Sequence, residues 1–348
     1  MNWFDRHIDQ NYAVFIVAEA GINHNGYFDL ALELIKQAKQ AGADCVKFQA
    51  FRTTSSESKH SSMPGYFDGR IGKMTKQEWS RSLEFTVEEF STLKTYCEEL
   101  DIAFLSTACD IEGLRILQKI GAGAVKLASA DTNNDYLLRA VGETGLPAIL
   151  SSGMSDMAAI EHAFETLHKF GNRQIALLQC TSQYPAPYDQ LNLRVIETFR
   201  KKFGCPVGLS DHSEGIHIPL AAVALGAQII EKHFTLSRNL PGVDHAASLE
   251  PDQFKEMVRC IQEIEGAMGS GKKKIQPDEI ENAKNMSRSL MAARPLSAGT
   301  RLTMEDITAK RPGTGLPPTE IDKLLGRRLV TDMEPEDFFS PEIIEGYE

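Results

Sequence analysis

The sequence lacks the features that direct a chain to a membrane, to nucleic acid or to a disulfide-rich fold. No apolar run approaches the ~20 residues that cross a bilayer, and the first residues, MNWFDRHIDQ, lack the apolar segment of a signal peptide. Positive charge is in deficit: 37 Lys and Arg face 48 Asp and Glu, a net charge of −11. This argues against nucleic acid or an anionic membrane as the main partner. The six cysteines form no CxxC pair, which predicts reduced, packed thiols and a cytoplasmic protein.

Short apolar runs alternate with amphipathic helical patterns along the first 270 residues. Near-continuous apolar strands separated by single helices are typical of a parallel sheet that is covered on both faces. Eight such units favour a closed (β/α)8 barrel over an open sheet. The predicted fold is therefore α/β, a TIM barrel with strands near residues 14–20, 44–51, 102–108, 124–129, 147–153, 174–181, 206–212 and 227–236.

The alternation of apolar runs and helical patterns ends near residue 285, and short strand-like pieces, turn residues and prolines follow. The stretch GSGKKKIQPDEIENAKNMSR is charged and polar and resembles a connection. We therefore predict a barrel domain over residues 1–270, a linker over 271–287 and a small, mostly β domain over 288–348. A linker of this length would let the small domain reach a neighbouring subunit.

Polar side chains gather at the carboxyl ends of the predicted strands, where TIM barrels carry their active sites. A buried lysine or glutamate at such a position must be paired or must bind something. One of them alone would fit a structural ion pair, but every strand end carries polar groups: Glu19; Lys47 and Gln49; Ser106 and Thr107; Lys126 and Ser129; Ser151 and Ser152; Thr181; Ser210, Asp211 and His212; Glu231, Lys232 and His233.

Two kinds of chemistry are indicated by these residue types. Lys47 and Lys126, with nearby hydroxyls, suit a phosphate in a water-poor pocket. His212 and His233 end adjacent strands, so their imidazoles would suit a divalent metal, although satisfied polar residues explain two histidines equally well. Glu231 lies two residues before His233, and side chains two apart on a strand point to the same side, so both should point inward. Glu231 could then serve as a metal ligand, as a hydrogen-bond partner of a metal ligand, or as a base.

The motifs AEAGINHNG, GADCVKFQAF, FLSTACD, KLASADTNN, ILSSGM, LLQCTSQYPAP, GLSDHSEGIHIPLAAVALGA, IEKHFTL, LPGVDHAASLEP and KRPGTG resemble those of the sialic acid synthase family, in order and over nearly the whole chain. The resemblance implies a barrel followed by an antifreeze-like (SAF) domain, in a swapped homodimer whose small domains cap the partner's active site. It implies an enzyme that condenses phosphoenolpyruvate with an N-acylated amino sugar, with N-acetylmannosamine as the first candidate.

The resemblance also implies a role for each matching residue. His212 and His233 would hold Mn²⁺, or else Mg²⁺ or Co²⁺, which polarises the sugar aldehyde. Glu231 would assist the water that adds to C2, with Glu19 and the two lysines as further catalytic residues. Phosphoenolpyruvate would be surrounded by Lys47, Thr107, Lys126, Ser129, Ser151, Tyr184 and Ser210. The sugar would meet Glu19, Gln49, Asp131 and Asp244, and the partner subunit's Arg311 would bind its N-acyl carbonyl.

The sequence departs from the family pattern at Asp131, Gln179 and Ser182, which leaves the amino sugar open. The segments GIHIPLAAVALGA and DHAASLEP resemble legionaminic acid synthases as closely as sialic acid synthases. The alternative is therefore a legionaminic or pseudaminic acid synthase that uses a 2,4-diacetamido-trideoxyhexose. A Schiff-base aldolase using Lys47 or Lys126 as nucleophile is a rival on the same barrel. A non-enzymatic ice- or carbohydrate-binding protein would explain the small domain but not the polar strand ends.

Overall fold

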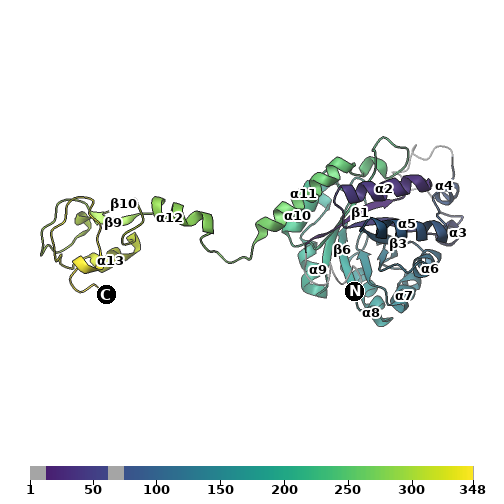
Figure 1. The fold of residues 1–348 in the computed structure, drawn as a ribbon. Helices are drawn as coiled ribbons and strands as arrows, with labels where there is room; N and C mark the ends of the chain where they lie inside the picture. The colour runs from purple at the N-terminus through teal and green to yellow at the C-terminus, as the bar shows by residue number, and fades with distance from the viewer. Residues whose placement is uncertain (1–12, 62–73, 348) are drawn as a thin grey trace. The chain divides into compact units, whose positions relative to one another are not determined.

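The structure, a computed structural model, describes residues 13–61 and 74–347. Its contacts divide the chain into two compact units, Met1–Gly269 and Ser270–Glu348 (Figure 1). The domain boundaries that the sequence predicts, at residues 270 and 287, stay predictions. Within the described residues no helix is both long and apolar enough to cross a membrane.

Eight parallel strands close into a barrel in the first unit, which confirms the predicted (β/α)8 fold. Each strand pairs with the next along the chain, and the first pairs also with the last, so the barrel has no free edge. The strands are β1 (Phe15–Gly21), β2 (Cys45–Ala50), β3 (Ala103–Ala108), β4 (Val125–Leu127), β5 (Ala148–Ser151), β6 (Ile175–Cys180), β7 (Val207–Asp211) and β8 (Ile229–His233).

Helices surround the strands (Figure 1). Local sequence fixes several of their ends: Thr86 and Glu89 form a capping box at the start of one helix, and Gly145 ends another with φ of 67°. The main helices of this unit are α2 (Phe28–Gln40), α5 (Val87–Glu99), α6 (Ile111–Lys119), α7 (Asp135–Thr144), α8 (Met157–Lys169), α9 (Val195–Phe203), α10 (His217–Ala224) and α11 (Pro251–Met268).

Two apolar cores lie on the two sides of the barrel wall. The larger core packs helices against strands, as with Leu34 and Val46. The smaller core fills the barrel interior and includes Phe15, Val17, Cys45, Leu105, Ile149, Leu178 and Ile229. Because side chains alternate along a strand, the next inward positions after this core are the polar residues at the carboxyl ends. The same alternation that builds the interior core therefore directs the polar residues into the mouth.

Two segments differ from the sequence prediction. The fourth strand, predicted over 124–129, is only Val125–Leu127, because the chain turns into a 3-10 helix at Ser129–Asp131. The connection between β2 and α5 contains two short helices that the sequence did not predict, α3 (Thr53–Ser56) and α4 (Lys76–Ser82).

The second unit has its own apolar core, which includes Leu290, Leu302 and Phe339. Its only regular sheet within the described residues pairs β9 (Ser289–Ala292) with β10 (Ile307–Lys310) in antiparallel fashion. The predicted linker contains a helix, α12 (Ile280–Met286), and a short helix, α13 (Ile321–Leu324), lies further along.

Candidate active site

A cavity of about 570 Å³ opens at the carboxyl ends of the barrel strands. Residues from all eight strand ends or the loops that follow them reach it. The lining residues used below are Glu19, Ile22, Lys47, Gln49, Glu57, Lys76, Trp79, Ser80, Thr107, Lys126, Ser129, Ser151, Tyr184, Ser210, His212, Glu231, His233, Val243 and Asp244. Most of the strand-end members are at least nine-tenths buried, so their charges must be matched within the cavity.

The register of the strands brings the polar residues level with one another. Glu19 on β1 lies beside Lys47 on β2 and beside His233 on β8. Thr107 on β3 is the partner of Lys126 on β4. Backbone pairing, rather than side-chain flexibility, therefore sets which groups meet.

Lys47 lies between two carboxylates. Its Nζ is 2.8 Å from Glu231 Oε2 and 3.4 Å from Glu19 Oε2. Burial opposes the charge of Lys47, but the two carboxylates outweigh burial and raise its pKa. Lys47 is therefore a permanent cation that joins β1, β2 and β8.

The two carboxylates that flank Lys47 differ in their proton affinity. Burial raises the pKa of Glu19 to about 7, although Lys47 opposes this shift. Burial acts in the same sense on Glu231, but Lys126 and Lys47 outweigh it and lower the pKa of Glu231 to about 2. The Ser210 hydroxyl also donates to Glu231, at 2.9 Å. Near neutral pH, Glu19 can therefore exchange a proton while Glu231 stays ionised.

Lys126 is held differently from Lys47. Its Nζ donates to Ser151 Oγ at 2.5 Å and to the carbonyl of Leu127 at 3.0 Å. Within the described residues no carboxylate forms a direct ion pair with it, and burial lowers its pKa. Lys126 is thus the lysine whose charge is best placed to be matched by an anionic substrate.

The imidazoles of His212 and His233 meet at the mouth, with their ring centroids 5.3 Å apart. His212 Nδ1 lies 2.8 Å from the Thr181 carbonyl and donates to it, so Nε2 is the nitrogen that is free in the neutral imidazole. Burial opposes the charged form of His212, but Cys180 and the Thr181 carbonyl outweigh burial and raise its pKa. His233 Nδ1 is buried and forms no hydrogen bond with a described residue, and burial lowers the pKa of His233 well below its usual value. The ring of Tyr184 packs 4.1 Å from His212.

A buried ion pair supports the two histidines from outside the cavity. Lys232 Nζ donates to Asp211 Oδ2 at 2.6 Å, and both side chains are almost fully buried. Glu231 and His233 line the cavity while Lys232 between them does not, as the strand period predicts. The pair joins the ends of β7 and β8, the two strands that carry the imidazoles.

The structure brings thirteen of the fifteen predicted site residues to one cavity, which leaves two outside it. Asp131 is not among the lining residues, because its Oδ1 accepts a hydrogen bond from Asn134 Nδ2 at 2.9 Å. Arg311 belongs to the second unit, where its Nε donates to the carbonyl of Met286 at 3.0 Å.

Comparison with known proteins assigns the chain to a family. The model of the NeuB family matches residues 34–273, and that of the SAF domain matches residues 287–342. The chain belongs to the NeuB family. An N,N'-diacetyllegionaminic acid synthase of Legionella pneumophila is 38% identical over 90% of this chain and 90% of its own. The human N-acetylneuraminate-9-phosphate synthase is 35% identical over 98% of this chain and 96% of its own.

A solved structure supports the same assignment. An N-acetylneuraminic acid synthetase from Leptospira borgpetersenii, in complex with citrate, is 38% identical, with a TM-score of 0.68 over 78% of this chain and 90% of that one. As a NeuB family member this protein is an enzyme, a synthase that forms a carbon–carbon bond. The predicted SAF domain is confirmed by the second family model.

Several cavity residues of this NeuB family member were missed from the sequence, and three of them matter most for the acceptor. Glu57, Lys76 and Trp79 line the cavity from the connection that follows β2. The sequence of that connection shows no clear apolar period, so it gave no reason to expect that the connection would line the cavity. One signal was present: Thr75 and Glu78 have the spacing of a capping box, and they start α4.

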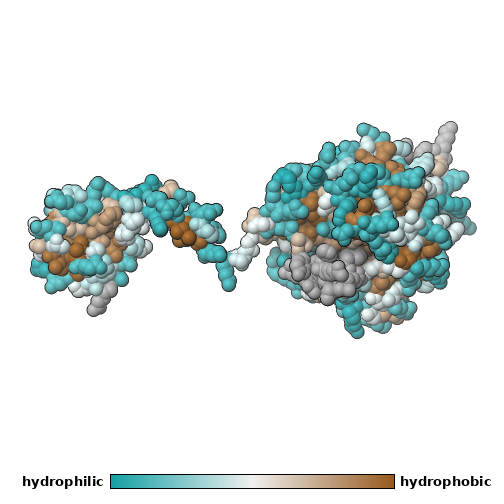
Figure 2. Space-filling model, in the orientation of Figure 1, coloured by the Kyte–Doolittle hydropathy of each residue, from teal (hydrophilic) through white to brown (hydrophobic). Residues whose placement is uncertain are grey.

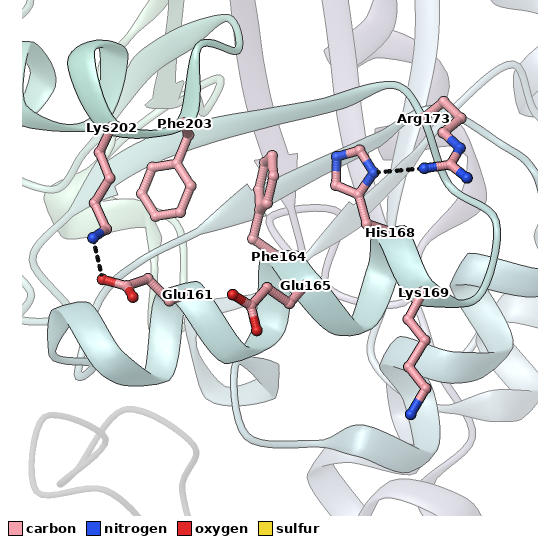
Figure 3. A pocket seen from close by; sticks show the side chains of 8 residues that line it. All are labelled: Glu161, Phe164, Glu165, His168, Lys169, Arg173, Lys202 and Phe203. Carbon is pink, nitrogen blue, oxygen red and sulfur yellow. Dashed lines mark hydrogen bonds and ion pairs between the residues drawn. The ribbon is translucent and has the colours of Figure 1, made fainter.

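A second hollow, of about 640 Å³, lies on the outer surface between α8 and α9 (Figure 3). Four of its polar groups form two pairs: Lys202 with Glu161 at 2.6 Å, and Arg173 with His168 at 3.3 Å. It contains no residue from the strand ends. The hollow offers no chemistry comparable with that of the barrel cavity.

Proposed function

We propose that this protein condenses phosphoenolpyruvate with the aldehyde form of an N-acylated amino sugar, N-acetylmannosamine being the first candidate, and releases inorganic phosphate. The observation that carries the proposal is the meeting of two buried lysines and two imidazoles in one cavity at the mouth of the barrel. The lysines suit an anionic substrate, and the imidazoles suit a metal beside a carbonyl.

Phosphoenolpyruvate is proposed to bind around Lys126. This lysine and Ser151 already form a donor pair, and Thr107 lies level with Lys126 on the neighbouring strand. Several charge-assisted hydrogen bonds in a buried site would hold the phosphate and carboxylate in one orientation. The hydroxyls of Ser129, Ser210 and Tyr184 complete the proposed set.

The proposed reaction forms a bond between C3 of phosphoenolpyruvate and the aldehyde carbon, whose oxygen takes up a proton. Water adds to C2, and cleavage of the C2–O bond releases phosphate and leaves a ketone. With its pKa of about 7, Glu19 is suited to exchange a proton near neutral pH. Glu231 stays ionised and holds Lys47 and Ser210 in place. The family resemblance implies that Glu231 assists the water that adds to C2. The proton affinities of the two carboxylates favour Glu19 for this role.

His212 and His233 are proposed to hold a divalent ion, Mn²⁺ first and Mg²⁺ or Co²⁺ as alternatives. The residues fit such an ion, because the Thr181 carbonyl engages only Nδ1 of His212, which leaves Nε2 as the coordinating nitrogen of the neutral ring, and His233 has a buried nitrogen without a hydrogen bond among the described residues. When bound, the ion supplies a Lewis acid for the aldehyde oxygen. Water or substrate would provide further ligands, since no group of three or more suitable side chains occurs in the described part of the chain.

A domain-swapped homodimer is proposed to complete the site, with the partner subunit's Arg311 on the N-acyl group of the sugar. Exposed apolar side chains on the second unit support an interface: Figure 2 shows brown surface on it, and Ile280 and Met286 of α12 are 52% and 57% exposed. A cytoplasmic location agrees with six free cysteines.

The test is phosphate release from phosphoenolpyruvate with Mn²⁺ and a panel of N-acylated amino sugars. We expect release that depends on the sugar and is abolished by a chelator. Release with a 2,4-diacetamido-trideoxyhexose alone would select the legionaminic or pseudaminic alternative. Borohydride trapping of Lys126 with a carbonyl substrate, unaffected by chelator, would instead support the aldolase and refute the proposal.

A further inference from the structure

One wall of the cavity is formed by the connection between β2 and α5. Glu57 and Lys76 meet there, with Lys76 Nζ 3.1 Å from Glu57 Oε2, and their side chains are 12% and 23% exposed. Ser80 Oγ donates to the other carboxylate oxygen of Glu57 at 3.3 Å. The positive charge of Lys76 is therefore matched by a fixed carboxylate inside the cavity.

The lysines that line the cavity differ in how fully their charge is matched by carboxylates. Within residues 13–61 and 74–269, three lysines line it: Lys47 is paired with two carboxylates, Lys76 with one, and Lys126 with a hydroxyl and a carbonyl. The proposed function assigns Lys126 to phosphoenolpyruvate. Of the described lysines, none then remains with an unmatched charge for a second phosphate group.

Apolar side chains lie beside this ion pair in the cavity lining. Trp79 packs with Ile22 and Val243, and all three line the cavity. Asp244, next to Val243 in the chain, adds a carboxylate to the cavity lining, 3.8 Å from His233 Nδ1. A methyl or acetyl group would gain from contact with the apolar trio, whereas a phosphate would meet carboxylates.

We infer that the acceptor is an uncharged amino sugar, and that Glu57 is a specificity-determining residue that cancels the charge of Lys76 and so disfavours phosphorylated acceptors. This inference rests on the proposed function and narrows its substrate class. Glu57 Oε2 is buried and forms no aligned hydrogen bond with a described residue, so it can also accept one from an amide or hydroxyl of the sugar.

The experiment compares N-acetylmannosamine with N-acetylmannosamine 6-phosphate in the full-length protein, with phosphoenolpyruvate and Mn²⁺. The wild type should favour the uncharged sugar in kcat/KM. Glu57→Gln keeps the hydrogen-bond acceptor for Ser80 but removes the negative charge that pairs with Lys76. The ratio of kcat/KM values should then shift toward the 6-phosphate by about five- to tenfold, mainly through KM. Adding Lys76→Met to this variant should remove the gain.

Glu84→Gln is the matched control. It breaks an ion pair of the same connection, with Arg52 at 3.5 Å, but Glu84 does not line the cavity. The preference should stay as in the wild type. A wild type that prefers the phosphorylated sugar, or a Glu57→Gln variant with an unchanged preference, would overturn the inference.

Calorimetric binding of both sugars without metal separates this inference from the proposed function. Absence of phosphate release by the wild type with every N-acylated amino sugar of the panel refutes the proposed function. The ratio of the two binding constants still tests Glu57: a ratio shifted toward the phosphate by Glu57→Gln supports the inference, and an unshifted ratio overturns it.

Discussion

Replacement of Glu19 by glutamine tests the charge balance at the mouth of the barrel. The carboxylate lies 3.4 Å from Lys47 Nζ and accepts a hydrogen bond from Gln49 at 3.2 Å, yet it is only 3% exposed. Burial outweighs the attraction of Lys47 and raises the pKa of Glu19 from 4.5 to about 7, with Glu231 adding to the rise. Glutamine keeps the shape of the side chain but cannot ionise.

The sign of the expected effect follows from proton binding. Between pH 4.5 and about 7, the folded protein keeps the proton on Glu19 while the unfolded chain has lost it. The free energy of unfolding of the wild type therefore falls as the pH rises through this window. At about 1.4 kcal/mol per unit of pKa shift, the loss amounts to roughly 3 kcal/mol above pH 7. Glu19→Gln should remove this loss.

The assay is urea unfolding in the presence of a chelator, followed by tryptophan fluorescence. Both tryptophans precede residue 270, so the signal reports the first unit. We expect the stability of Glu19→Gln, relative to the wild type, to increase by about 2.5 kcal/mol between pH 5 and pH 8, because part of the change has already occurred at pH 5. Taking the difference between the two proteins cancels the titration of groups that they share.

Ser210→Ala is the control for this measurement. It removes the hydroxyl that donates to Glu231, whose pKa of about 2 lies outside the pH range measured. Its stability relative to the wild type should not depend on pH between 5 and 8. A relative stability of Glu19→Gln that is flat over this range, or that decreases, would refute the account of the carboxylate pair.

Three further predictions test the substrate, metal and subunit proposals. Lys126→Met should raise KM for phosphoenolpyruvate at least about tenfold, because a buried charged donor is lost, and steady-state phosphate release measures this. His212→Ala should weaken Mn²⁺ binding by roughly 100-fold or more in calorimetry while the circular dichroism spectrum is kept; unchanged affinity would exclude the site. An equal mixture of Arg311→Ala and His233→Ala should regain about one quarter of wild-type activity after subunit exchange, and no recovery would argue against a shared site.

The sequence predicted the barrel and most of the cavity because both depend on the same strand period. Inward apolar positions such as Val17 and Leu105 predict the interior core, and the inward positions that follow them, Glu19 and Thr107, reach the mouth. TIM barrels carry their sites at that end, so residues from distant parts of the sequence could be assigned to one place.

Other features depend on contacts that no local pattern encodes. Asp131 is near the correct strand end, but a turn at Ser129–Asp131 directs its carboxylate to Asn134. The Glu57–Lys76 pair joins residues on either side of 62–73, a segment outside the described residues, within a connection without periodicity. Such pairings become visible only when the segments lie side by side.

The charge arrangement also separates two lysines that the sequence treats as equivalent. Lys47 is already matched by Glu19 and Glu231, so binding a phosphate there would require a third anion next to two carboxylates. Lys126 has a lowered pKa and only neutral hydrogen-bond partners, so an incoming anion stabilises its charge and is itself stabilised. We therefore expect Lys126 to contribute more than Lys47 to binding of the anionic substrate. Lys47 holds one carboxylate that can exchange a proton and one that stays ionised.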